Sequence, residues 1–270
     1  MDYERNQFEN AIITMTNNIA RGKSTMNVRE LKLFLSALSL VRTRDKNCWI
    51  QLNKAELMRK LEIDPRDSTK LEDLYNEVKT KSRITYRNYE QSESETGDII
   101  RKVRQTKHHL YIRFDEDYIP LLDELDKHFT WFYLDNIACF KSKHAITLFK
   151  YLRSWYSDVR PTTTKYIPLD ELRFDVFGLS PDAYMVKRRT KDKTSTSMIF
   201  DIYTFEKKVL NKAIMEINEE KNGSGMRVEV KKEKSKGGTV QGYNFEFLLI
   251  NKSGVNKFDI SEEKRERNYL

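Results

Sequence analysis

Hydrophobic positions in the first half of the chain change their period several times, and each change marks an element. Apolar residues recur at three- and four-residue spacing from Val28 to Val41, as on one face of an amphipathic helix. Asn53 is followed three residues later by Glu56, a capping-box pattern that starts a helix. The pattern predicts a helix over 27–43, a strand over 49–52, a helix from 54, a turn over 63–67 and a helix over 68–81.

Stretches of β-type residues follow this third helix. They predict strands over 84–89, 99–103 and 110–114, with the polar segment 91–97 as the hairpin tip between the first two. Helix, strand, helix, turn, helix and hairpin is the order of a winged helix. A linking helix from Tyr118, with Pro120 in its first turn, and an extended aromatic segment over 129–134 complete this half.

The same order returns in the second half, starting at Ser142, a good N-cap residue. The expected elements are a helix to about 156, a strand over 166–168, a helix over 169–177 ended by Gly178, a basic loop over 184–198, a helix over 204–218, and strands over 226–232 and 240–250 joined at Gly237-Gly238. We expect an α+β fold of tandem winged-helix domains. Residues 1–127 form the first domain with its linking helix, 128–252 the second, and 253–270 a charged tail.

Charge and cysteine usage narrow the class of protein. The chain has 270 residues, 39% of them hydrophobic, and 49 Lys and Arg against 41 Asp and Glu, for a net charge of +8. This excess suits a polyanionic partner. Cys48 and Cys139 lie far apart, which favours a reducing cytosol over a disulfide framework. We expect a cytoplasmic protein without a membrane span, because no apolar run reaches 18 residues.

The chain lacks the residue patterns that several kinds of catalysis require. Gly22-Lys23-Ser24 has no upstream glycine to form a phosphate loop. His108 and His109 are adjacent and would point to opposite faces of a strand, unlike the metal-binding pair of nicking enzymes. The acidic run 115–117 opens a predicted helix, where it would compensate the helix dipole. We therefore expect no enzyme activity, no metal and no cofactor.

The two predicted third helices have different outward faces. In the first copy, the face opposite the expected buried residues Leu71, Leu74, Tyr75 and Val78 carries Asp73, flanked by Glu72 and Glu77, and phosphate would be repelled there. Such a helix could meet DNA mainly through its start. The candidate DNA-binding residues at that start are Arg66, Ser68, Thr69 and Lys70.

In the second copy the corresponding face is basic. The expected buried residues are Phe205, Val209, Leu210, Ala213, Ile214 and Ile217, and the opposite face offers side chains that can read base edges and phosphates. Residues 187–212 hold eight basic and three acidic residues, so they supply +5 of the net charge. The wing would add Lys231, Lys232, Lys234 and Lys236 to the same side. The candidate DNA-binding residues of this copy are Thr204, Lys207, Lys208, Asn211, Lys212, Lys187, Arg188, Arg189, Lys231 and Lys232.

Four motifs between about residues 118 and 250 resemble a known family. They are the segments 121–130, 148–155, 167–173 and 205–218, the last ending in the Ala-x-x-Glu-Ile-Asn pattern of Ala213 to Asn218. In this combination they are similar to the theta-type plasmid replication initiators, proteins with two winged-helix domains. The resemblance follows element order over about 5–250. The segment 184–198 departs from the family in being longer and more basic.

This resemblance implies a function. Initiators of this type bind directly repeated origin sites, called iterons, and start replication by origin opening and recruitment of the host initiator, helicase and polymerase. The second domain is then expected to read the major groove. The first domain would contact the DNA backbone in the monomer and form the interface of a homodimer. Dimers would repress the protein's own gene.

Two alternatives remain open from the residues alone. A transcriptional repressor on the same fold would need only an operator, and usually one winged helix. A nickase-type enzyme is disfavoured by the histidine pattern, but with 14 tyrosines in the chain a single nucleophilic tyrosine stays possible.

Overall fold

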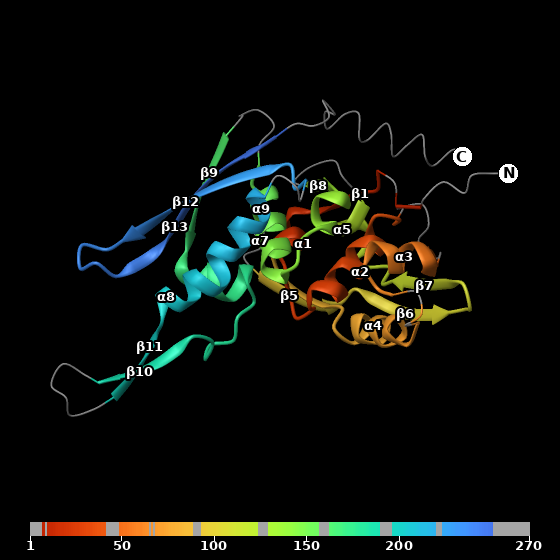
Figure 1. Ribbon diagram of the computed structural model, residues 1–270, viewed down its shortest axis with the longest axis horizontal. Helices are drawn as coiled ribbons and strands as arrows, with labels where there is room; N and C mark the ends of the chain where they lie inside the picture. Colours follow the sequence, from red (N-terminus) through yellow and green to blue (C-terminus); the bar gives the residue numbers. More distant parts are fainter. Residues whose placement is uncertain are drawn as a thin grey trace.

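The computed structural model describes residues 7–8, 10–41, 49–64, 66, 68–88, 93–123, 129–156, 162–189, 196–219 and 223–250. Helices and strands are mixed throughout, so the α+β class is confirmed (Figure 1). The elements of the first half are β1 (Ile12–Thr16), α1 (Asn17–Arg21), β2 (Lys23–Ser24), α2 (Val28–Leu38), β3 (Ile50–Asn53), α3 (Lys54–Lys60), α4 (Ser68–Thr80), β4 (Arg83–Asn88), β5 (Glu93–Asp98), β6 (Ile100–Gln105), β7 (His109–Phe114) and α5 (Ile119–Asp123).

The second half continues with further strands, α-helices and two π-helical segments, η2 and η3. Its elements are β8 (Phe129–Tyr133), α6 (Asp135–Ala138), α7 (Lys143–Arg153), β9 (Thr162–Pro168), η2 (Glu171–Val176), β10 (Met185–Arg189), β11 (Thr196–Phe200), α8 (Ile202–Phe205), η3 (Glu206–Leu210), α9 (Asn211–Asn218), β12 (Met226–Lys234) and β13 (Val240–Leu249). The predicted tail 253–270 lies outside the described residues.

The first winged helix consists of α2, α3 and α4 with the antiparallel sheet β3-β7-β6. Strand β7 lies in the middle, with Leu110 opposite Leu52 on β3 and Ile112 opposite Val103 on β6. Every second residue of β7 is buried, and alternate residues of a strand share a face, so one face of this sheet is buried. The predicted buried residues of α4, Leu71, Leu74, Tyr75 and Val78, are all buried.

Helix α2 begins as predicted but ends early. Asn27 Oδ1 accepts a hydrogen bond from the Glu30 N–H at 3.0 Å, and the Glu30 carboxylate accepts one from the Asn27 N–H at 2.7 Å, which completes a capping box. The predicted extension is wrong over residues 39–41, since α2 ends at Leu38, and residues 42–43 lie outside the described part. There the N–H groups of residues 40–41 bond to carbonyls three residues back, a tighter turn that closes the helix.

The start of α3 uses a residue that sequence reasoning did not consider. Asn53 Oδ1 accepts hydrogen bonds from the N–H groups of Ala55 and Glu56, so the predicted cap is confirmed. The predicted return bond from Glu56 to the Asn53 N–H is wrong. Gln7 takes both places: its backbone N–H donates to Glu56 Oε2 at 2.8 Å, and its Oε1 accepts from the Asn53 N–H at 3.0 Å.

The strands after α4 form two hairpins rather than one. The expected hairpin tip 91–97 contains a strand, β5, which pairs along β4 from Arg83↔Asp98 to Asn88↔Glu93. Strand β6 therefore pairs with β7 instead of β4. The residues of β5 are nearly all exposed, and without a buried face they show no hydrophobic alternation that would mark a strand.

A strand near the N-terminus was also missed. Strand β1 pairs in antiparallel register with β8, the extended aromatic segment predicted over 129–134. Two buried threonines join these strands to the helices α5 and α1. Thr14 donates its hydroxyl to the Leu122 carbonyl at 3.3 Å, and Thr130 donates to Asn17 Oδ1 at 2.6 Å.

The second winged helix repeats the order of the first. Ser142 caps α7 by accepting the Ala145 N–H at 3.2 Å, and Gly178, at φ +60°, ends the η2 segment, as predicted. The wing strands β12 and β13 join β9 in the sheet β12-β13-β9. The expectation of a basic loop over 184–198 is wrong in part. Strands β10 and β11 occupy parts of this segment, pair from Met185↔Phe200 to Arg189↔Thr196 and form a hairpin.

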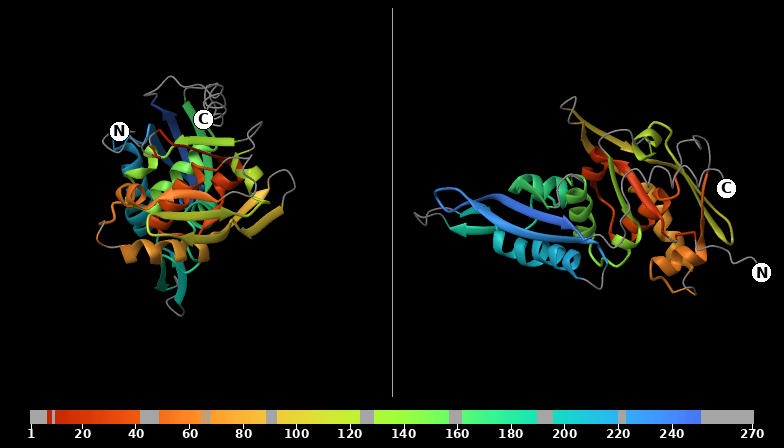
Figure 2. Two further views of the ribbon diagram at one scale, coloured as in Figure 1. Left: turned by 90° about the vertical axis from the view of Figure 1, so that its right-hand side faces the viewer. Right: turned by 90° about the horizontal axis from the view of Figure 1, so that it is seen from above.

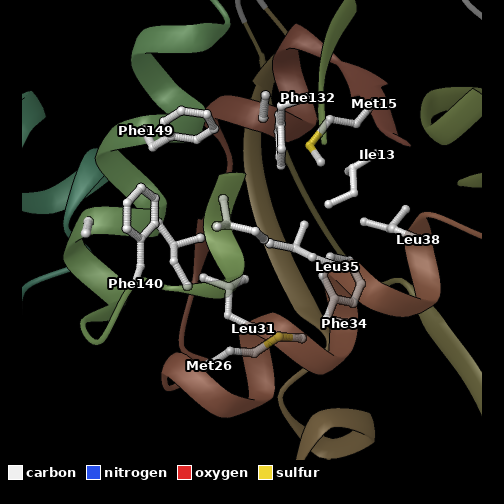
Figure 3. Close-up of a cluster of buried hydrophobic side chains, with 14 of the residues drawn as sticks. Ile13, Met15, Met26, Leu31, Phe34, Leu35, Leu38, Phe132, Phe140 and Phe149 are labelled. Atoms are coloured by element: carbon white, nitrogen blue, oxygen red, sulfur yellow. The ribbon is translucent and has the colours of Figure 1, made fainter. Parts of the chain in front are cut away.

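The two winged helices share one core. Figure 3 shows Leu31, Phe34 and Leu35 of α2 near Phe132 of β8 and Phe149 of α7, segments from both copies of the motif. The Phe132 and Phe149 rings meet edge to face with their centroids 5.4 Å apart. The two domains therefore pack directly on each other.

The molecule is elongated, with hairpins at both ends. Figures 1 and 2 show the β12–β13 wing and the β10–β11 hairpin projecting at one end of the long axis. The β6–β7 hairpin of the first domain points to the other end. The helix α8–η3–α9 lies between the two projections of the second domain (Figure 1).

Candidate nucleic-acid interface

The third helix of the second domain runs through α8, η3 and α9 without interruption. It begins at Asp201, whose carboxylate accepts hydrogen bonds from the Thr204 N–H at 3.2 Å and the Thr204 hydroxyl at 2.6 Å. These bonds lower the pKa of Asp201, because they stabilise the charged carboxylate. The helix therefore starts at Ile202 rather than 204, and Thr204, a predicted DNA contact, is half-buried with its hydroxyl on the cap.

One side of this helix is fixed in the core. The Phe205 ring lies 5.9 Å from that of Phe177 and 5.3 Å from that of Phe200, centroid to centroid. The predicted buried side is confirmed: Phe205, Val209, Leu210, Ala213 and Ile217 are at most 1% exposed, and Ile214 is half-buried. Packing thus determines which face of the helix is left for a partner.

The middle of the helix, η3, is π-helical, a wider turn that is frequent at functional sites. Its first residue, Glu206, faces the wing. The Glu206 carboxylate lies 2.6 Å from Lys232 Nζ and accepts a hydrogen bond from the Tyr243 hydroxyl at 2.7 Å. Burial and this hydrogen bond raise the pKa of Tyr243. Glu206 therefore ties the helix to both wing strands.

The opposite side of the helix presents the predicted basic face. Lys207, Lys208, Asn211 and Lys212 are exposed, as expected for a helix that enters a DNA groove. Two large side chains stand among them: Tyr203 is 68% exposed and Met215 is 72% exposed. Tyr203 is not among the residues predicted from the sequence, and its ring centroid lies 6.0 Å from Lys207 Nζ.

The β10–β11 hairpin brings further positive charge beside the start of this helix. Lys187 and Arg188 are exposed on β10. Arg189 is the last residue of that strand, and its side chain lies outside the described part. Met198, 52% exposed, stands opposite Lys187 on β11, so the hairpin also presents an apolar side chain to solvent.

The wing divides its lysines between two faces. Lys232 lies opposite the buried Tyr243 and turns toward the helix, whereas Lys231 lies opposite Asn244 on the other face of the sheet. The prediction that the wing lysines share one side is therefore wrong for Lys231, because successive strand residues point to opposite faces. Lys231 remains exposed at the edge of the molecule.

The predicted contacts of the first domain lie apart from this surface (Figure 1). Thr69 and Lys70 are exposed in the first turn of α4, while the Arg66 guanidinium is bound to the Asp64 carboxylate at 2.8 Å. Ser68 starts α4, and its side chain lies outside the described part. The acidic outward face is confirmed, with Glu72, Asp73, Asn76, Glu77 and Thr80 all exposed.

Sequence reasoning missed a second basic surface on the first domain. The hairpin 100–114 carries five Lys and Arg and no acidic residue. Of these, Arg101, Lys102, Arg104 and Lys107 are exposed. The signal was present in the sequence as an alternation of His109, Tyr111 and Arg113 with apolar residues, which places the three on one sheet face.

Neither a metal centre nor a membrane-spanning helix is found among the described residues. No group of three or more His, Cys, Asp and Glu side chains in that part of the chain could hold a metal ion. None of its helices is long and apolar enough to cross a membrane.

Comparison with known proteins gives two family matches. The family described as "Initiator Replication protein, WH1" matches residues 12–153, and "Initiator Rep protein, WH2" matches residues 169–247. No curated protein sequence matches the chain.

Solved structures provide a fold-level match. A crystal structure of Pi initiator protein in complex with iteron DNA superimposes with a TM-score of 0.67 at 17% identity, over 90% of this chain and 99% of that one. A structure of domains 2 and 3 of RctB matches with a TM-score of 0.45 at 12% identity, over 86% of each chain.

The two family matches and the Pi initiator fold agree with the repeated order of elements described above. The WH1 region 12–153 contains the whole first winged helix together with α7, and the WH2 region 169–247 runs from η2 into the wing strand β13, so the tandem winged-helix fold is confirmed. The family resemblance drawn from the four motifs is confirmed with it. The chain belongs to the family of initiator replication proteins and is a plasmid replication initiator with two winged-helix domains, WH1 and WH2.

Proposed function

We propose that this initiator binds directly repeated duplex sites, iterons, at a plasmid origin through the helix of residues 202–218. The observation that carries the proposal is the outward face of that helix, where Lys207, Lys208, Asn211 and Lys212 stand exposed on a scaffold fixed by a buried opposite side. Lysine can donate to guanine acceptors, asparagine can pair with adenine, and Met215 can contact a thymine methyl group. The iteron complex of the structurally similar Pi initiator supports this choice.

The hairpin and the wing would supply affinity rather than sequence preference. They project on either side of the helix (Figure 1). Their solvent-exposed Lys187, Arg188 and Lys231 would contact the phosphate backbone. Arg189 of β10 and Lys232 of β12 belong to the same proposed contacts. Neutralised phosphates release counterions, so binding should weaken steeply as salt concentration rises.

The two domains would have different roles. We assign duplex recognition to residues 128–252, and dimer formation with backbone contacts near Arg66, Ser68, Thr69 and Lys70 to residues 1–127. The exposed acidic face of α4 supports this division, because carboxylates repel phosphate. A homodimer in equilibrium with a monomer would let the dimer repress the gene, while the monomer acts at the origin.

Origin opening would need no covalent chemistry. Repeated binding along adjacent sites can bend the duplex, and the deformation energy depends on how stiff the sequence is. The unwound origin would then be passed to the host initiator, helicase and polymerase. Such a protein acts in the cytoplasm, where plasmid DNA is found.

The test is a selection of bound fragments from the replicon that encodes the protein, at near-physiological salt. Recovery of a short direct repeat, with affinity well above that for random DNA, is the expected result. An inverted repeat at the promoter alone would contradict the proposal and favour a transcriptional repressor. Salt-sensitive binding without an enriched sequence would also contradict it.

A further inference from the structure

The outer face of the β3-β7-β6 sheet carries aromatic and basic side chains together. Strand β7 alternates His109, Tyr111 and Arg113 with buried apolar residues, so these three share the face turned away from the core. Across the sheet, Arg104 on β6 and Gln51 on β3 both lie opposite Tyr111. This sheet face is a surface distinct from the acidic face of α4.

The centre of this sheet face is a stack of flat groups. The Arg104 guanidinium carbon lies 4.7 Å from the Tyr111 ring centroid and 5.1 Å from the Trp49 ring centroid, so it bridges the two rings. The His109 ring lies 6.1 Å from that of Tyr111. Trp49 and Tyr111 are half-buried, while Arg104 is exposed. The two rings of the stack are therefore partly covered, and its guanidinium is accessible to solvent.

Positive charge surrounds the stack. Lys102, two residues before Arg104 on β6, stands opposite Arg113, and Lys107 is exposed at the hairpin tip. Glu116 lies near this edge, 2.5 Å from Arg113 and 3.8 Å from Arg101. The hairpin as a whole carries five Lys and Arg against no acidic residue, so the face is complementary to a polyanion.

Flat groups and positive charge in this combination suit unpaired bases. In a duplex the faces of the bases are covered by stacking, and an outside protein meets only phosphates and groove edges. A single strand exposes those faces, which stack on aromatic rings and on guanidinium planes while phosphates meet lysine and arginine. We propose that the sheet face formed by Trp49, Arg104 and Tyr111, with Lys102 and Lys107 beside them, binds single-stranded DNA.

The placement of this face fits a second role in the same reaction. The β6–β7 hairpin lies at the end of the molecule opposite the β10–β11 hairpin and the wing (Figures 1 and 2). One molecule can therefore hold a duplex at one end and an unpaired strand at the other. In this respect the inference rests on the proposed function, since origin opening is what supplies the unpaired strand.

The experiment measures binding of the full-length protein to a fluorescent 20-mer of deoxythymidine and, separately, to the duplex recovered by selection. Arg104→Ala removes the bridging guanidinium from an exposed position and is expected to weaken binding of the single strand at least tenfold, with duplex binding unchanged. Arg83→Ala is the matched control, because Arg83 is an exposed arginine of the same domain on another sheet, bound to Asp98 at 3.2 Å. It should change neither affinity.

A second variant reports on stacking directly. Trp49 is one of three tryptophans in the chain, and a base stacked on it should quench its fluorescence when the oligonucleotide binds. Trp49→Phe keeps an aromatic ring, so it should retain most of the affinity while losing that quenching. Quenching that persists in this variant would show that the strand binds elsewhere and would overturn the proposal.

The remaining outcomes separate the two proposals. Equal loss of single-strand and duplex binding in Arg104→Ala would reassign this face to the duplex backbone and overturn the inference. The inference would also be overturned if the wild-type protein bound the duplex but not the single strand. It would be overturned as well if Arg104→Ala changed only the oligomeric mass. The duplex proposal is tested independently: it fails if the selection of bound fragments recovers no direct repeat.

Discussion

Lys208 is the residue at which sequence preference should be most directly tested. It is exposed on the outward face of the π-helical segment, beside Lys207 and ahead of Asn211. Lys208→Ala should lower the preference for the cognate repeat over random DNA by ~1–3 kcal/mol, as for a side chain that contacts a base edge. Titrations on both DNAs check this, with Lys187→Ala on the hairpin as the comparison that should weaken both equally. An equal loss on both DNAs for Lys208→Ala would assign it to a phosphate.

Lys150 affects stability rather than binding. It is 3% exposed in α7, and burial lowers its pKa from 10.5 to about 8. Protonation of Lys150 therefore opposes folding. The free-energy cost of burying the charged ammonium group is present in full below pH 8 and disappears as pH rises from 8 to 10.5. At ~1.4 kcal/mol per pKa unit, Lys150→Met should raise the free energy of unfolding at pH 7 by up to about 3 kcal/mol. It should also abolish the rise in stability between pH 8 and 10.5.

Urea unfolding across that pH range measures the effect. Lys79→Met on α4 is the control, because Lys79 is exposed and a surface change of this kind should stay within about 0.5 kcal/mol. A destabilised Lys150→Met would contradict the prediction, since it would mean that the ammonium group makes a net favourable contact.

At the scale of elements, Glu206 couples the recognition helix to the wing. Glu206→Gln keeps an acceptor for the Tyr243 hydroxyl but removes the charge 2.6 Å from Lys232. Loss of this partly buried ion pair should cost about 1 kcal/mol of unfolding free energy. The same change leaves Lys232 without its counter-charge, so binding to random duplex should tighten. The slope of log affinity against log salt should then steepen by ~0.9.

Unfolding in urea and a salt titration on random duplex test the two consequences separately. Arg227→Gln, an exposed charge change near the base of the same wing strand, should leave the stability nearly unchanged. An unchanged salt slope in Glu206→Gln would show that Lys232 does not face DNA.

Helix α4 allows a matched pair of substitutions on one element. Asp73 and Lys70 are both exposed there. Asp73→Ala should leave monomer binding to the repeat within twofold, whereas Lys70→Ala should weaken cognate and random DNA alike by ~0.5–1 kcal/mol, as for a backbone contact. A large loss in Asp73→Ala would contradict the assignment of this helix to a role outside the groove.

The elements also show where sequence reasoning succeeds. Helix α4 and the helix over 202–218 were predictable because each buries an apolar stripe with helical period, and that stripe fixes the outward face. Strand β5 and the β10–β11 hairpin were not, because their residues are mostly exposed and only pairing with a neighbouring strand defines them. The helix that carries the candidate interface is therefore predictable from the sequence, whereas the hairpin beside it has the sequence pattern of a loop.

At the scale of the whole molecule, one core joins both winged helices. Arg21 in α1 reaches the far end of α7, where its Nε donates to the Ser154 hydroxyl at 2.9 Å and its Nη2 donates to the Ser154 carbonyl at 2.9 Å. Its guanidinium carbon lies 3.4 Å from the Trp155 ring centroid. Hydrogen bonds from a charged group and a cation–π contact are each worth about 1–3 kcal/mol when partly desolvated.

We therefore expect urea unfolding of the wild type to be a single transition, and Arg21→Ala to lower its free energy by about 2–3 kcal/mol. Arg83→Ala should change it by less than about 1 kcal/mol, because the Arg83 side chain is 66% exposed beside Asp98 and exposed ion pairs contribute little. Two separate transitions in the wild type would contradict the shared core. The domains would then unfold independently, and the relative position of the duplex site and the first-domain sheet face would not be fixed by packing.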